Sequence, residues 1–123
     1  MKQMVRGELE RDRYRVIEEP LYPPVNRVSW VAYRPDLLGF RSDLTTDEIA
    51  VVECETHPSM TRFISKNYSS LWFQPSMFRD GSIRRILAVP RGKLHSVDPK
   101  LRKGWEIWVL GSTRPLEKIP AIA

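Results

Sequence analysis

The chain has 123 residues, of which 41% are hydrophobic and 28% charged, and its net charge is +5. This composition predicts one globular domain with a modest core and excludes wholesale disorder. No apolar run reaches the roughly eighteen residues that a membrane-spanning helix needs, and the charged N-terminal stretch lacks a signal-peptide core. The single cysteine, Cys54, excludes an internal disulfide and fits a reducing compartment. We therefore expect a cytoplasmic protein that contacts no membrane.

Hydrophobic periodicity predicts a mixture of helices and strands. In chain order we expect a helix over residues 2–12, strands over 14–19, 28–34 and 49–55, a helix over 57–73, a strand over 83–90, a short helix or turn over 97–104, and a strand over 105–112. The first helix has Met4, Val5 and Leu9 on one stripe. The strand over 49–55 is apolar on both faces, which is typical of a central strand.

These elements predict an α/β fold with a mixed central sheet flanked by helices. Residues 1–112 would form the domain, and residues 113–123 would be a C-terminal tail over its surface. A turn over 42–48 lies between two hairpin strands, and the extended chain can continue beyond residue 34 through "DLLGFR", residues 36–41. We consider a hairpin in which residues 28–36 pair with residues 49–55.

Three carboxylates stand at the ends of the most apolar segments. Asp36 follows Pro35, and Glu53 and Glu55 end the central strand. Side chains two residues apart share a face of a strand, so Glu53 and Glu55 point the same way and Cys54 points to the other side. Converging carboxylates repel one another and lose hydration, which raises their pKa values unless a cation neutralises them. The pattern predicts a Mg²⁺ or Mn²⁺ site, because both ions prefer hard oxygen ligands.

Strand pairing decides whether Asp36 reaches this site. In the hairpin expected above, Asp36 lies toward the turn. Its approach to Glu53 then requires a bend, which Gly39 permits.

The Pro-Asp dipeptide, the turn, the apolar strand ending in Glu-X-Glu and the helix after it resemble the PD-(D/E)XK nuclease superfamily, which has the restriction-endonuclease-like fold. "RPDLLGF" is similar to its first motif and "VVECE" to its second, and the elements expected over roughly residues 2–91 match its α-β-β-β-α-β core. The resemblance implies that Asp36 and Glu53 bind Mg²⁺ or Mn²⁺ and that the Cys54 carbonyl adds an oxygen ligand. It also implies hydrolysis of phosphodiesters.

Glu55 occupies the position of the family's lysine, which orients the attacking water and stabilises developing charge. A glutamate there acts as a base or an extra ligand in some members and marks lost activity in others. Candidates for a displaced cation are Lys66 and Lys93, and candidates for the first-helix glutamate of many members are Glu8 and Glu10.

A purely structural interpretation competes with the metal site. Asp36 after a proline can cap a turn, and Glu53 and Glu55 can pair with arginines on neighbouring strands. Those arginines would be Arg34, Arg84 and Arg85. Trp105 and Trp108 recur three residues apart in a strand, so they face opposite sides and favour core packing over base stacking.

We therefore expect a metal-dependent DNA nuclease, in which Asp36, Glu53 and Glu55 are catalytic. A single small domain offers little surface for a duplex, which favours a homodimer. The residues expected to contact phosphates are Lys66, Arg84, Arg85, Arg91 and Lys93. Two alternatives stay open: a catalytically inactive DNA-binding or assembly module of the same fold, and a protein-interaction domain of unrelated α/β fold.

Overall fold

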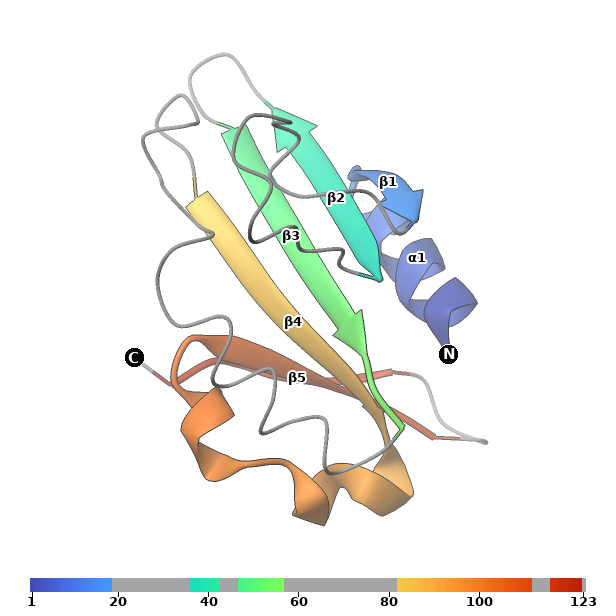
Figure 1. The fold of residues 1–123 in the computed structure, drawn as a ribbon. Coiled ribbons are helices and arrows are strands. Elements are labelled where there is room, and N and C mark those ends of the chain that lie inside the picture. Colours follow the sequence, from blue (N-terminus) through green and yellow to red (C-terminus); the bar gives the residue numbers. More distant parts are fainter. Residues whose placement is uncertain (19–35, 43–46, 57–81, 112–115, 123) are drawn as a thin grey trace, which may run out of the picture.

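One α-helix and a six-stranded sheet make up the described part of the chain in a computed structural model, which covers residues 1–18, 36–42, 47–56, 82–111 and 116–122 (Figure 1). The elements are α1 (Lys2–Arg11), β1 (Arg15–Glu18), β2 (Leu37–Ser42), β3 (Asp47–Cys54), β4 (Ser82–Pro90), the 3₁₀ helices η3 (Arg91–Ser96) and η4 (Pro99–Arg102), β5 (Trp105–Leu110) and β6 (Glu117–Ile119). Among these residues, no helix is long and apolar enough to cross a membrane.

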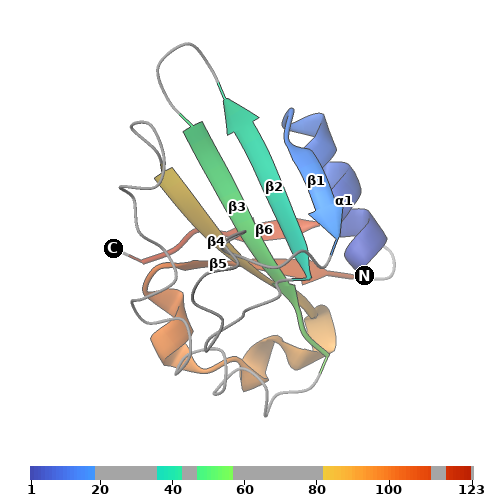
Figure 2. The ribbon, with the colours of Figure 1, turned by 45° about the horizontal axis from the view of Figure 1, so that its top comes forward.

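The sheet is mixed, and its strands follow one another in sequence order from β1 to β6. β1, β2 and β3 form an antiparallel meander, β4 and β5 run parallel to β3, and β6 returns antiparallel to β5. Figure 2 shows how the sheet twists from β1 to β6. The expected single α/β domain with a mixed sheet is therefore confirmed.

Two hydrophobic clusters cover the two faces of the sheet. On one face, Val5 and Leu9 of α1 pack against alternate residues of the strands, and we call this the α1 face. It contains Tyr14, Leu37, Ala50, Val52, Ile86, Ala88 and Trp108.

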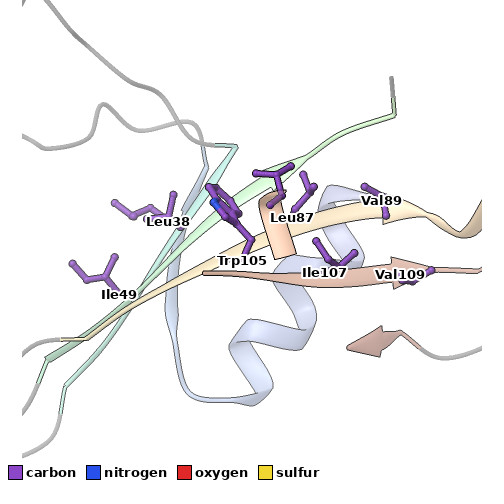
Figure 3. Packing of buried hydrophobic residues seen from close by; sticks show 9 residues of the cluster. Leu38, Ile49, Leu87, Val89, Trp105, Ile107 and Val109 are labelled. Atoms are coloured by element: carbon purple, nitrogen blue, oxygen red, sulfur yellow. The ribbon is translucent and has the colours of Figure 1, made fainter. Parts of the chain in front are cut away.

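The opposite face is covered in part by the segment that joins β4 to β5, residues 91–103, which we call the connector. Its Leu94, Val97 and Leu101 pack onto the sheet, so we call this the connector face. Figure 3 shows the labelled core residues of this face on the side of the sheet away from α1: Leu38, Ile49, Leu87, Val89, Trp105, Ile107 and Val109.

Helix α1 forms because Val5 and Leu9, four residues apart, both bury their side chains against the sheet. Met4, expected on the same stripe, is instead 50% exposed. The helix ends where Arg13 adopts φ 69°, a left-handed conformation. This reversal lets the N–H of Tyr14 donate to the Leu9 carbonyl and directs the chain into β1.

The hairpin strand before β3 is Leu37–Ser42, with Leu37 opposite Val52 and Ser42 opposite Asp47. Asp36 therefore lies at the end of the hairpin away from the turn, and the expectation that it lies toward the turn is wrong. Gly39 does not bend the chain toward the carboxylates. It lies within β2 and makes room for Tyr14, whose Cδ1 atom would lie 3.2 Å from any Cβ at this position.

Three further expectations from the sequence have different outcomes. The strand over 28–34 and the helix over 57–73 lie outside the described residues. The expected flanking of the sheet by several helices is not found in the described part of the chain, where α1 covers one face and the 3₁₀ helices contact the other. Part of the expected tail belongs to the sheet, because Glu117–Ile119 forms the edge strand β6.

Candidate functional site

Asp36 and Glu53 meet at one end of the β2–β3 pair. The pairing of Leu37 with Val52 places the preceding Asp36 opposite the following Glu53. Directly opposed residues of antiparallel strands share a face and hold their Cβ atoms roughly 5 Å apart. Both residues alternate with members of the connector-face core, Leu38 on β2 and Val51 on β3. The two carboxyl groups therefore lie on the connector face.

A backbone hydrogen bond fixes the orientation of Asp36. The N–H of Cys54 donates to Oδ2 of Asp36 over 2.7 Å, whereas the N–H of Glu55 donates to the Ala88 carbonyl over 2.9 Å on the other side of the strand. The N–H and C=O of one strand residue point to the same side. The Cys54 carbonyl therefore points toward the β2 side, where Asp36 lies.

The pKa of Glu53 is strongly raised by its surroundings. Burial, the negative charge of Asp36 and a hydrogen bond to the Asp36 side chain raise the pKa of Glu53 to about 9, and the negative charge of Glu55 adds to the shift. A hydrogen bond from the Asp36 backbone N–H acts in the opposite direction. Glu53 therefore keeps its proton at neutral pH.

This arrangement has the chemistry of a small hard-cation site. Mg²⁺ is usually bound by one or two carboxylates and keeps several water ligands. Asp36 and Glu53 supply two carboxylates, and the Cys54 carbonyl supplies a third oxygen of the right type. Within the described residues, no group of three or more His, Cys, Asp or Glu side chains is arranged to hold a metal ion. The described part of the chain thus offers a two-carboxylate site, and Glu55 does not complete a third ligand.

The Cys54 side chain lies on the opposite face, as its place in β3 predicts. It packs against the α1-face cluster. Burial is the main reason that its pKa rises to about 12, and the charges of Asp36 and Glu53 raise it further. The thiol therefore stays protonated and is a poor metal ligand, so the carbonyl is the relevant group of this residue.

Glu55 follows Glu53 on the same side of the strand and is half-buried. Its charge contributes to the raised pKa of Glu53, which shows that the two carboxylates interact. A carboxylate at this position can accept a proton from water but cannot neutralise negative charge as a lysine would.

Arg84 does not pair with these carboxylates. It lies on the α1 face, where its guanidinium forms two hydrogen bonds to Glu106, of 2.7 and 2.8 Å, and one of 3.1 Å to the Tyr14 hydroxyl. Hydrogen bonds to Glu106 raise the pKa of Arg84. Burial pushes the pKa of Glu106 upward, but the hydrogen bonds and charge of Arg84 lower it overall. Arg84 is thus ion-paired within the fold, and its expected contact with phosphates stays a prediction.

The other predicted phosphate contacts are spread over the molecule. Lys93 is exposed on η3, and Arg91 at the start of η3 lies 3.1 Å from Glu117. Arg85 is half-buried on β4, and Lys66 lies outside the described residues. The first-helix candidates are engaged elsewhere, Glu8 with Lys118 at 3.0 Å and Glu10 with Arg6 at 3.6 Å.

Sequence reasoning missed a charged network on the α1 face. Arg41 binds Glu48 and stacks over the Tyr14 ring at 4.4 Å, Arg84 binds Glu106, and Lys118 lies 4.7 Å from the Trp108 ring centre. The available signal was a charged residue on each of two apolar strands, Arg84 in β4 and Glu106 in β5. Trp105 and Trp108 face opposite sides as expected, and both are core residues.

Comparisons of the chain with protein-family models, with curated proteins and with solved structures found no match.

Proposed function

We propose that this protein is a metal-dependent nuclease of the restriction-endonuclease-like class, which hydrolyses DNA phosphodiesters with Mg²⁺ or Mn²⁺ held by Asp36 and Glu53. The observation that carries the proposal is the opposition of these two carboxyls across β2 and β3, with the pKa of Glu53 raised to about 9. A divalent ion would relieve this repulsion by replacing the proton of Glu53. The order α1-β1-β2-β3 followed by a parallel β4 agrees with the core that the sequence resembles.

In the proposed reaction, each residue of the site has its own role. Asp36 and Glu53 would hold the cation, and the Cys54 carbonyl would add an oxygen ligand. When bound, the cation supplies charge stabilisation and a more acidic water. Glu55, beside Glu53, would accept a proton from the attacking water.

The test is cleavage of end-labelled DNA as duplex, single strand, flap and four-way junction, with Mg²⁺ or Mn²⁺. We expect metal-dependent cleavage by the wild type and loss of cleavage in Asp36→Asn and Glu53→Gln. Glu10→Gln is the matched control, because it removes one carboxylate that is 52% exposed on α1. Cleavage that persists in either site variant would contradict the proposal.

The alternative is a nuclease fold that binds nucleic acid without cutting it. Two observations favour it: a glutamate at position 55 and the lack of a three-ligand cluster among the described residues. The variant Glu55→Lys separates the two functions. Cleavage by this variant alone would identify a retired active site, whereas cleavage by the wild type that Glu55→Lys alters would assign Glu55 a working role.

A further inference from the structure

The connector carries most of the net charge of the chain. Its thirteen residues, 91–103, include five lysines and arginines and one acid, Asp98, while the whole chain has a net charge of +5. The basic residues are Arg91, Lys93, Lys100, Arg102 and Lys103, and His95 lies among them. A positive excess this concentrated attracts a polyanion more strongly than charges dispersed over the surface.

Apolar anchors hold the connector in a defined orientation. Leu94, Val97 and Leu101 pack onto the connector face of the sheet. Asp98 caps η4, because its side chain accepts a hydrogen bond of 3.0 Å from the N–H of Lys100. With its apolar side chains turned inward, the connector exposes its cations, and Arg91, Lys93, His95, Lys100 and Lys103 are all exposed.

The connector lysines differ in their pairing from four basic residues of α1, β2, β4 and β6, whereas Arg13 and Arg15 resemble the connector lysines in forming no ion pair with a described residue. Arg6, Arg41, Arg84 and Lys118 each form an ion pair with a glutamate. In the connector, Arg91 pairs with Glu117, but Lys93, Lys100 and Lys103 form no ion pair with any described residue. Their charge is therefore available to a partner.

The connector also begins at the edge of the sheet where the carboxylate pair lies. β4 runs parallel to β3, and the N–H of Glu55 bonds to the Ala88 carbonyl, so both strands end at the same edge of the sheet. η3 follows β4 directly at that edge, as the orange segment in Figure 1 shows. Asp36, Glu53 and the packed side of the connector share the connector face.

We propose that the connector binds the phosphodiester backbone of a nucleic acid, without reading its sequence, and holds the strand beside Asp36 and Glu53. The inference deepens the proposed function and rests on it for the choice of the scissile site. A membrane surface fits less well, because Leu94, Val97 and Leu101 are turned into the core and leave the connector without an apolar face for lipid.

The test is binding of a fluorescein-labelled duplex and a single strand in EDTA, measured by anisotropy over a series of salt concentrations. The variant is Lys93→Ala/Lys100→Ala/Lys103→Ala. The control, Arg11→Ala/Arg13→Asn/Arg15→Ala, removes three exposed charges from α1 and its junction with β1. Asparagine at position 13 tolerates the left-handed backbone there.

We expect the connector variant to bind nucleic acid about tenfold more weakly or worse. The slope of log affinity against log salt concentration should become less steep by about three, since each lost phosphate contact contributes about 0.9 to it. Equal losses in the connector variant and the control would overturn the proposal. So would binding of the wild type to vesicles of 30% phosphatidylserine in phosphatidylcholine but not to nucleic acid.

The design separates this inference from the proposed function. Because EDTA removes divalent ions, binding is measured without cleavage. Connector-dependent binding with no cleavage at any metal concentration would leave the connector proposal standing and reject the nuclease. Metal-dependent cleavage that the connector variant retains in full, with unchanged affinity, would reject the connector proposal and leave the nuclease standing.

Discussion

Partly buried charged side chains have different partners on the two faces of the sheet. On the α1 face, acids meet bases: Arg84 binds Glu106, and Arg41 binds Glu48. At the end of the sheet on the connector face, two acids meet each other, since Asp36 lies opposite Glu53. Opposite charges in contact satisfy one another, whereas like charges in contact require a proton or a cation. The α1-face network is therefore a set of ion pairs between opposite charges, whereas the pair of Asp36 and Glu53 is the site that our proposal assigns to a cation.

The largest effect that separates the two faces is the pH dependence of stability. Because the pKa of Glu53 is about 9 in the folded protein and its ordinary value is 4.5, the folded state binds more protons between these values. The contribution of Glu53 to stability is therefore fully present below about pH 4.5 and is lost as pH rises toward 9, by up to about 1.4 kcal/mol per pH unit for one proton. Urea unfolding at pH 6, 7 and 8 without divalent ions measures this slope.

Glu53→Gln tests the assignment of that slope. The amide keeps the shape of the protonated carboxyl but does not titrate, so the variant should lose most of the decline and exceed the wild type in stability at pH 8. Glu10→Gln should keep the wild-type slope. Equal slopes of unfolding free energy against pH in wild type and Glu53→Gln would show that Glu53 does not cause the decline in stability.

The α1 face should respond in the opposite way when one partner is removed. Arg84→Ala leaves Glu106 half-buried without its two hydrogen bonds and removes a donor to Tyr14. We expect a loss of about 3 kcal/mol in the free energy of unfolding, at the lower end for a buried pair because both side chains retain some exposure. Urea unfolding at pH 7 measures it.

The double variant Arg84→Met/Glu106→Gln provides the comparison. Replacing both charges removes the unpaired carboxylate, so part of the lost stability should return. A cost below about 0.5 kcal/mol for Arg84→Ala would place this pair with ordinary surface ion pairs and weaken the contrast between the faces.

The sequence alone predicted much of the fold and less of the site. Strands β3, β4 and β5 were recognisable because their apolar runs are long and bounded by turn residues. The pairing of β2 was not, because residues 28–34 alternate whereas residues 37–42, LLGFRS, do not, and local pattern carries no information about which segment pairs with β3. That choice of register decides whether Asp36 lies at the turn or opposite Glu53.

The ion-pair partners of individual charged residues could not be predicted from the sequence either. Arg84 and Glu106 occupy adjacent strands, and their contact depends on the parallel register of β4 and β5, which is set by tertiary packing. The role of the connector was hidden for a similar reason. Its cations were visible in the sequence, but only the burial of Leu94, Val97 and Leu101 shows which way they point.

The smallest of the expected effects tests the carboxylate pair with its proposed ligand. Mn²⁺ at about a hundred times its dissociation constant should stabilise the wild type by about 2.7 kcal/mol, because it binds the folded state alone. The gain should be larger at pH 8 than at pH 5, since the ion competes with the proton that Glu53 holds. Thermal unfolding with and without Mn²⁺ measures it. Asp36→Asn and Glu53→Gln should lose the gain, whereas Glu10→Gln and Arg84→Ala should keep it, because neither changes the pair. A shift of equal size in all four variants would mean that Mn²⁺ binds elsewhere, and the opposed carboxyls would then be a hydrogen-bonded contact of the fold.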